Sequence, residues 1–79
     1  MSERERSRDS YDENLMMHVG NNVRCLRESK HLTQHALAKR ASMSRPAIAN
    51  IEAGRQNINL THLMRIAQAL EVTASDILP

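Results

Sequence analysis

The sequence predicts an all-α domain. The chain has 79 residues with one Tyr and no Phe or Trp, so its core must be built from aliphatic side chains and Met. Aromatic and β-branched residues usually gather in sheets, so this composition favours packed helices. Two Gly and two Pro leave few turn residues for hairpins. A chain of this length forms one small domain, close to the lower limit for a self-sufficient core.

The net charge of +2 is unevenly divided along the chain. Residues 1–13 carry three Arg and five acidic residues, whereas residues 14–79 carry eight Lys or Arg and four acidic residues. The part expected to fold is therefore basic, which favours an acidic partner such as nucleic acid. A solvated surface of mixed charge is the alternative that charge alone leaves open.

The compartment is predicted from what the sequence contains. A single cysteine, Cys25, cannot form an intrachain disulfide, and beside Leu26 it fits a partly buried apolar position. There is no secretory segment, and no apolar run approaches the ~20 residues of a membrane span. We therefore expect a cytoplasmic protein that does not bind membranes.

The N-terminal residues differ from the rest in composition. Residues 1–11 alternate charges with Ser and hold almost nothing that a core could bury, so we expect a disordered arm there. The domain is then expected to cover residues 12–79.

Its first helix is predicted from about Asp12 to Ser29. Residues three and four apart share a helix face, and the apolar face here holds Leu15, Val19, Val23 and Leu26.

Gly20 interrupts the pattern of the first helix. A glycine inside a helix costs about 1 kcal/mol relative to Ala. A close approach of another helix would justify that cost; without one, we expect the helix to bend at this position.

Two short helical patterns follow, separated by a break at residues 41–44. Thr33 is a suitable N-cap for a helix ending near Ala41, and Ser44 for a helix ending near Ala53. Pro46 falls in the first turn of the helix that Ser44 caps, the third predicted helix of the chain, where a missing N–H costs nothing. Gly54 can adopt the left-handed conformation that ends a helix. The residues expected to face inward are Leu37, Ala38, Ile48 and Ile51, and the small Ala38 would permit two helices to cross closely.

This layout, two helices joined by a short turn, is that of a helix-turn-helix. Asn59 then caps a fourth helix from Leu60 to about Leu70, and Thr73 opens a one-turn fifth helix. Thr73 and Asp76 have the spacing of a capping box, with Asp in place of Glu. The sequence therefore predicts five helices.

Residues 20–78 resemble the Cro/C1 or XRE-type family of phage-repressor-like regulators. The resemblance rests on V-R-x-L-R at residues 23–27, L-T-Q-x-x-L-A at 32–38 and S-R-x-x-I-x-x-I-E-x-G at 44–54, followed by L-x-x-I-A-x-A-L at 63–70. It implies a compact five-helix, lambda-repressor-like DNA-binding domain with the helix-turn-helix at helices 2–3. The length also resembles that of the controller proteins of restriction–modification systems.

Four positions depart from the family pattern. His31, Ser42 and Glu71 stand at turn positions where the family often has Gly, and Ile58 stands where Pro is common. A non-glycine residue with positive φ costs roughly 1 kcal/mol. We therefore expect local changes in turn geometry rather than a different fold.

The resemblance implies that residues 44–53 form a recognition helix in the major groove of double-stranded DNA. Arg45 can donate two hydrogen bonds to guanine, and Asn50 can pair with adenine in the same bidentate way. Pro46 and Ala47 offer apolar contact only. The predicted base contacts are Arg45, Pro46, Ala47 and Asn50.

The ends of the predicted helices offer contacts to phosphate. In the family that the chain resembles, the residue corresponding to Gln34 bonds a backbone phosphate, helped by the free amides of the helix start. The loop after the recognition helix provides contacts on the other side, which set register without reading sequence. The predicted phosphate contacts are Thr33, Gln34, Ser44, Arg55, Gln56 and Asn57.

Glu52 lies near the C-terminal end of the third helix, where a negative charge is unfavourable. A cation must neutralise it, and the family resemblance implies Arg27 of the first helix. We therefore expect Arg27 and Glu52 to form a structural ion pair rather than a contact to DNA.

A single domain of this size contacts few base pairs, so we expect a homodimer on a near-palindromic operator. By elimination, the dimer interface is predicted in the C-terminal region, at Leu60, Met64, Val72, Ile77 and Leu78. The alternative is a protein-interaction module, such as an antitoxin-like domain that binds a partner protein. Whether the protein represses or activates is left open.

No catalytic, metal or cofactor site is expected. His31 and His35 are separated by a loop-to-helix junction, and with His18 and Cys25 they form no complete metal-ligand pattern. The sequence holds no nucleophile–base set, glycine-rich phosphate loop or pair of carboxylates suited to catalysis. We expect neither enzymatic activity nor a small-molecule ligand.

Overall fold

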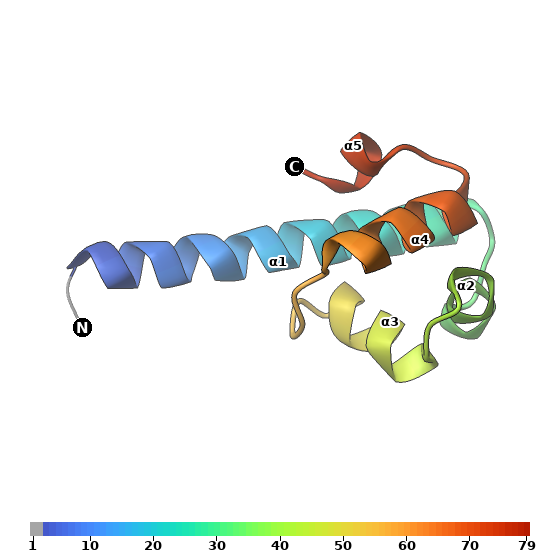
Figure 1. Ribbon diagram of the computed structural model, residues 1–79, viewed down its shortest axis with the longest axis horizontal. Helices are drawn as coiled ribbons and strands as arrows, with labels where there is room; N and C mark the ends of the chain where they lie inside the picture. The colour runs from blue at the N-terminus through green and yellow to red at the C-terminus, as the bar shows by residue number, and fades with distance from the viewer. Residues whose placement is uncertain (1–2) are drawn as a thin grey trace.

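The computed structural model describes the backbone of residues 3–79 and the side chains of residues 12–79. Within that part of the chain all regular structure is helical, as predicted (Figure 1). The five helices are α1 (Glu3–Ser29), α2 (Gln34–Ala41), α3 (Arg45–Glu52), α4 (Leu60–Leu70) and α5 (Ala74–Ile77).

α1 begins at Glu3, earlier than the predicted start near Asp12, and ends at Ser29 as predicted. Its first turns are rich in Glu and Arg, which favour helices, and extending an existing helix fixes only one residue per hydrogen bond. The helix therefore covers residues 3–11, where we expected disorder, while Met1 and Ser2 lie outside the described residues. In Figure 1 the N-terminal part of α1 projects beyond the other helices. The division of the chain at residue 11 into arm and domain stays a prediction.

The starts of three helices are fixed by the predicted N-caps. Thr33, Ser44 and Asn59 each have extended backbone angles and precede α2, α3 and α4. Each side-chain oxygen accepts a hydrogen bond from the backbone N–H three residues later, at 3.0, 3.1 and 2.7 Å respectively. One amide of each helix start is thereby satisfied.

The core lies where α1 crosses α3 and α5, and where α2 contacts α3 and α4. Its buried apolar residues are Val19, Val23, Leu37, Ala38, Ala41, Ile48, Ile51, Leu63, Ile66, Ala67, Leu70 and Ile77. Cys25, by contrast, is exposed, although we expected partial burial. It follows Val23 by two residues, which turns its side chain to the opposite side of α1.

The ends of α1 to α4 each have a residue in the left-handed conformation: at the end of α3 it is the predicted Gly54, with φ of 72°, and at the other three it is not a glycine. His31, Ser42 and Glu71 have φ of 57°, 56° and 58°. Ser42 and Glu71 donate backbone N–H bonds to the last carbonyls of α2 and α4, which closes the end of each helix. His31, Ser42 and Glu71 are three of the four positions where the sequence departs from the family pattern. Although none of them is glycine, each adopts the left-handed conformation that glycine adopts without strain.

Gly20 permits a close approach between α1 and α3. A Cβ atom at this position would collide with the carbonyl oxygen of Ile51 and lie 2.9 Å from that of Glu52. The C-terminal end of α3 therefore rests directly on the backbone of α1. Of the two explanations for Gly20 that the sequence left open, the close approach of another helix is therefore the one that the structure shows.

Candidate nucleic-acid interface

α2 and α3 form the predicted two-helix unit, joined by the short turn that Ser42 begins. Ile48 and Ile51 hold α3 in the core, with 0% and 1% of their surfaces exposed. The opposite side of α3 is open to solvent: Arg45 and Pro46 are exposed, and Ala47 and Asn50 are half-buried. The four predicted base contacts are therefore at least partly open to solvent, whereas Ile48 and Ile51 are not.

A chain of four hydrogen-bonded side chains runs from the core to the start of α3. Arg27 Nε and Nη2 donate to the two carboxylate oxygens of Glu52, at 2.7 and 2.9 Å. Gln34 Nε2 donates to Glu52 Oε1 at 3.1 Å, and Arg45 Nη1 donates to Gln34 Oε1 at 3.2 Å. Gln34 thus fixes one nitrogen of the exposed Arg45 and leaves the other N–H donors of the guanidinium free.

The inner pair of this chain is largely excluded from water. The side chains of Arg27 and Glu52 are 12% and 4% exposed, and Arg27 also donates to the carbonyl oxygen of Leu32 at 2.8 Å. The hydrogen bond to Glu52 raises the pKa of Arg27, while burial opposes the rise. Arg27 is therefore charged at any physiological pH, and its charge balances that of Glu52 at the end of α3.

The predicted phosphate contacts occupy two separate places. Thr33, Gln34 and Ser44 lie at the N-terminal ends of α2 and α3, where free amides and the helix dipole favour anions. The hydroxyl oxygens of Thr33 and Ser44 accept the capping bonds, which leaves each hydroxyl proton free to be donated. The second place is the α3–α4 loop, where Arg55 and Asn57 are exposed and Gln56 is half-buried.

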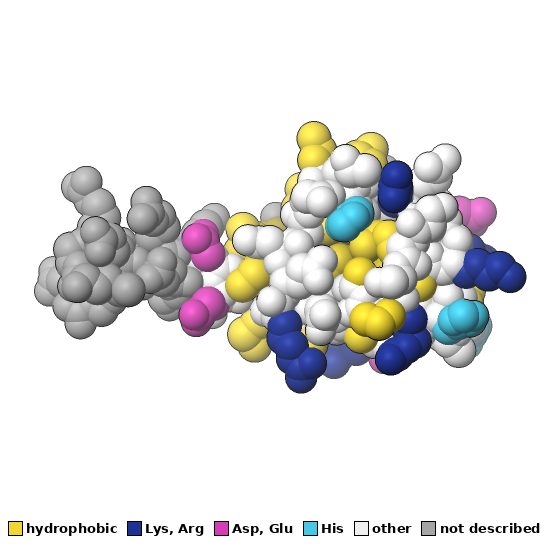
Figure 2. Space-filling view, turned by 60° about the horizontal axis from the view of Figure 1, so that its bottom comes forward, with side chains coloured by type: hydrophobic (Ala, Val, Ile, Leu, Met, Phe, Trp, Pro, Cys, Tyr) yellow, Lys and Arg dark blue, Asp and Glu magenta, His cyan; other side chains and the backbone are white. Residues whose placement is uncertain are grey.

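Figure 2 shows the face formed by α2 and α3. Lys and Arg side chains stand around the margin of this face, and the clearly visible Asp and Glu side chains lie near its two ends. The surface between the cations is made mostly of uncharged groups. A polyanion lying across this face would therefore meet positive charge on several sides.

The predicted dimer residues divide into exposed and buried groups. Leu60, Met64 and Leu78 are 74%, 53% and 42% exposed. Val72 is half-buried against the core. Ile77 is 0% exposed, and its backbone carbonyl accepts a hydrogen bond from Asn22 at 2.8 Å. The assignment of Ile77 to an interface is therefore wrong, because the folding of α5 onto α1 already uses its side chain.

Sequence reasoning missed the contacts of Gln34 with both Glu52 and Arg45. Residue spacing carried no signal for them, since the partners lie 18 and 11 positions away.

In the described part of the chain, no helix is long and apolar enough to cross a membrane.

The fold, the exposed side of α3 and the cationic margin together define a helix-turn-helix DNA-binding domain. A family model for the helix-turn-helix family HTH_3 matches residues 23–77. The chain belongs to this family of transcriptional regulators and is not an enzyme.

Two characterised relatives differ in how much of their length the chain covers. Over 61 residues it is 39% identical to the immunity repressor protein of Bacillus phage phi105, which covers 77% of this chain and 42% of the repressor. Over 66 residues it is 35% identical to control protein C.BamHI of Bacillus amyloliquefaciens, covering 82% of each. The chain thus spans less than half the length of the phage repressor but most of the control protein.

Solved structures of controller proteins have the same fold. The restriction–modification controller protein C.AhdI of Aeromonas hydrophila superposes with a TM-score of 0.78 at 27% identity, over 80% of this chain and 96% of that protein. The wild-type controller protein C.Esp1396I gives a TM-score of 0.72 at 30% identity, over 75% and 76% of the two chains. The prediction of a lambda-repressor-like five-helix domain is confirmed.

Proposed function

We propose that this chain binds a near-palindromic operator in double-stranded DNA as a homodimer, with α3 in the major groove of each half-site. The observation that carries this proposal is Arg45, an exposed guanidinium at the N-terminal end of α3, held at one nitrogen by Gln34. A side chain at this position of a recognition helix reaches base edges.

Arg45 is the main candidate for sequence discrimination. A guanidinium can donate two parallel bonds to O6 and N7 of guanine, which distinguishes guanine from the other bases in the major groove. Its contact with Gln34 limits the rotamers of Arg45 before DNA binds, so less side-chain entropy is lost on binding. Asn50, one and a half turns along the same helix, is the candidate for adenine. Pro46 and Ala47 would supply apolar contact to a thymine methyl group.

Positioning on the duplex would come from the helix ends and the loop. Gln34, Thr33 and Ser44 present donors to one strand, and residues 55–57 present donors to the other. Phosphate contacts of this kind fix register and orientation and carry no base information.

The dimer would form through the exposed apolar side chains of α4 and the C-terminus. Two-fold symmetry would place the two copies of α3 about one helical turn apart, ~34–36 Å, on the same side of the duplex. Leu60, Met64, Val72 and Leu78 remain the candidates after the removal of Ile77.

Selection from random duplex DNA tests the proposal directly. We expect an enriched sequence with two inverted half-sites, centred 10–10.5 base pairs apart or a multiple of that spacing, and each half-site should contain a guanine that Arg45 requires. The same selection with Arg45→Ala should lose the preference at that guanine. Enrichment of no sequence, with uniform binding to all duplexes, would contradict sequence-specific recognition.

A further inference from the structure

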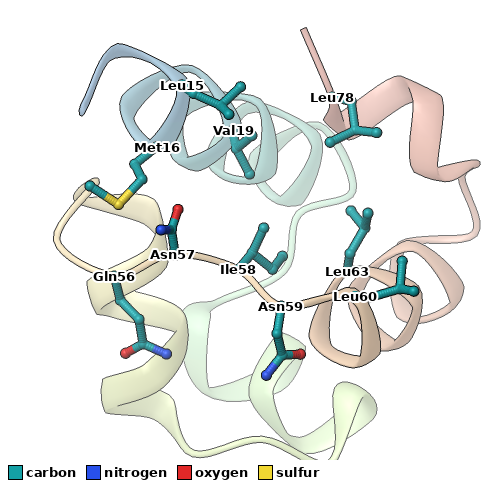
Figure 3. A pocket seen from close by; sticks show the side chains of 10 residues that line it. All are labelled: Leu15, Met16, Val19, Gln56, Asn57, Ile58, Asn59, Leu60, Leu63 and Leu78. Carbon is teal, nitrogen blue, oxygen red and sulfur yellow. The ribbon is translucent and has the colours of Figure 1, made fainter. Parts of the chain in front are cut away.

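A cavity of about 230 Å³ lies between α1, the α3–α4 loop and the start of α4 (Figure 3). Leu15 and Val19 of α1, Ile58 of the loop and Leu63 of α4 form its apolar walls. Leu60 and Leu78 stand at its rim, and none of the residues that line it carries a charge. The cavity belongs neither to the base-contacting side of α3 nor to the α2 N-terminus.

The apolar surface extends well beyond the cavity. Leu60 is 74% exposed, the largest exposed fraction among the large apolar side chains that the structure describes, and Figure 3 shows it directed away from the cavity. Leu78, also at the rim, and Met64, one turn further along α4, are exposed as well. A small molecule inside the cavity would leave these three side chains in water. Their burial requires an occupant with a surface of its own, such as a second protein chain.

A second copy of this chain fits that occupant in both charge and shape. Residues 14–79 have eight basic and four acidic residues, so two copies repel each other unless they meet through uncharged surface. The cavity and its rim are such a surface. A projecting Leu60 directly beside an apolar hollow is also suited to a two-fold contact, because each copy can supply both the projection and the hollow.

We propose that each copy of this chain inserts Leu60 into the cavity of the other, and that the insertion stabilises the loop that contacts DNA phosphate. The proposal rests on the dimeric, DNA-binding function proposed above and specifies the contact that forms the dimer. It adds a link between that contact and the DNA-binding surface.

The link is the α3–α4 loop itself. Gln56 and Asn57, two of the predicted phosphate contacts, also line the cavity, and Ile58 between them and α4 forms part of its wall. A side chain packed against Ile58 restricts this loop before DNA arrives. The entropy of ordering the loop is then lost on dimerisation rather than on DNA binding. Each subunit of the dimer should therefore bind a half-site more tightly than a monomer does.

Sedimentation equilibrium of the full chain and its variants tests the contact. Leu60→Glu should raise the dissociation constant of the dimer by about 100-fold or more, since two apolar side chains are lost per dimer and two charges are placed in the contact. Leu60→Met keeps an apolar projection and should stay within a few-fold of wild type. Gln68→Glu adds the same charge elsewhere on α4 and should have little effect. Because Leu60 is mostly exposed, thermal melting should show that all four proteins fold.

Binding to a duplex with one half-site tests the link to DNA without a contribution from double-site binding. Above the dimer dissociation constant, wild type should bind this duplex roughly 5–10-fold more tightly per subunit than Leu60→Glu does. Amide exchange in residues 55–58 should be slower in wild-type dimers than in Leu60→Glu at the same concentration.

Each result identifies which proposal fails. An unchanged dimer in Leu60→Glu, or wild-type protein that stays monomeric on and off DNA, overturns the contact. Equal half-site affinity and equal loop exchange overturn the link to the loop. A wild-type dimer that depends on Leu60 but selects no DNA sequence would uphold the contact and overturn the proposed operator binding.

Discussion

At the scale of single residues, Glu52 combines two roles that are seldom found together. It is the only charged residue among the buried side chains that the structure describes, and it contacts both a structural arginine and the exposed end of the two-helix unit. The carboxylate stabilises the packing of α3 on α1 and at the same time orients the amide of Gln34. A substitution there would therefore affect stability and DNA recognition together.

Removal of Arg27 should be strongly destabilising. Arg27→Ala leaves the Glu52 carboxylate buried without its cation, and we expect a loss of roughly 3–5 kcal/mol in the free energy of unfolding. Urea denaturation measures this loss, with Lys30→Ala as an exposed control near the same helix end. In the double variant with Glu52→Gln, the second substitution should recover part of the loss. An unchanged melting temperature in Arg27→Ala would show that the pair contributes nothing.

The pH dependence of this pair follows from the raised pKa of Arg27. A group whose pKa is higher in the folded state stabilises the fold below its unfolded pKa, and that stabilisation is lost as the pH rises through the folded value. For an arginine this window lies in strong alkali. The contribution of Arg27 should therefore be constant across the neutral range.

Glycine at position 42 should stabilise the protein. Ser42 has φ of 56°, and this conformation costs a residue with a Cβ atom about 1–2 kcal/mol. Glycine avoids this strain, but it loses roughly 0.5–1 kcal/mol more conformational entropy on folding than a residue with a side chain. Ser42→Gly should gain about 0.5–1 kcal/mol in thermal or urea unfolding. Ala53→Gly, at an ordinary φ of −83°, is the matched control and should lose stability. A loss in both would mean that Ser42 makes a compensating contact.

Gly20 should behave in the opposite way from most helical glycines. Exchange for Ala usually stabilises a helix interior by about 1 kcal/mol. Here the new Cβ would lie 2.9 Å from the Glu52 carbonyl oxygen, so α3 must move away and we expect a loss of roughly 1–3 kcal/mol. Calorimetric melting measures it, and Asn21→Ala, the exposed neighbour on α1, should not destabilise. A more stable Gly20→Ala protein would show that α3 can shift without penalty.

At the scale of elements, α2 and α3 pack together through buried residues, and Gln34 adds a hydrogen bond between the starts of the two helices. The cap residues Thr33 and Ser44 fix where each helix begins, and the bond between Gln34 and Arg45 fixes how the two starts face each other. The side chain predicted to dock on phosphate thus also positions the one predicted to contact a base.

Arg45→Ala tests this division of roles. We expect it to lose about 1–3 kcal/mol of binding free energy on the selected site and much less on random duplex. Fluorescence anisotropy on both duplexes measures the difference, and Lys39→Ala removes one positive charge from α2 outside the predicted contacts as a control. Equal losses on both duplexes would make Arg45 a phosphate contact.

The elements also show which helix boundaries were predictable. The starts of α2, α3 and α4 follow from Thr33, Ser44 and Asn59, because a cap acts within three residues of itself. The start of α1 did not follow from sequence, because residues 3–11 show no apolar helical pattern and only their intrinsic propensity favours a helix. The positive φ values at His31 and Glu71 match glycine positions of the family, yet the residues themselves give no local signal for them.

At the scale of the whole molecule, the predicted phosphate contacts include few cations, although other Lys and Arg side chains stand around the same face. Of the predicted phosphate contacts only Arg55 is charged, and the others are amides and hydroxyls. Neutral donors position a duplex without displacing counterions, so the affinity of this protein should depend on salt less than that of a cation-rich binder.

A salt series measures this property. With two to four phosphates neutralised per dimer, the plot of log K against log salt concentration should have a slope of about −2 to −4. Arg55→Ala should reduce the steepness by about two, one charge from each subunit. A slope near zero would contradict electrostatic docking, and a much steeper one would show that other cations, such as Arg40 or Arg65, also contact the backbone.

The sequence by itself determined the presence of five helices, the N-caps of α2, α3 and α4, and the buried residues of α1, α2 and α3 that recur at helical spacing. These properties depend on neighbours within three or four positions, where spacing and residue type are sufficient. The residues proposed to face a duplex followed instead from the family resemblance. Tertiary structure decided that Gln34 bridges Glu52 and Arg45, that Ile77 is core, and that an apolar cavity is lined by the α3–α4 loop. Those features arise where helices cross, between residues 11 to 55 positions apart. The angle and depth of each crossing depend on the packing of all the buried side chains together, which no local pattern contains.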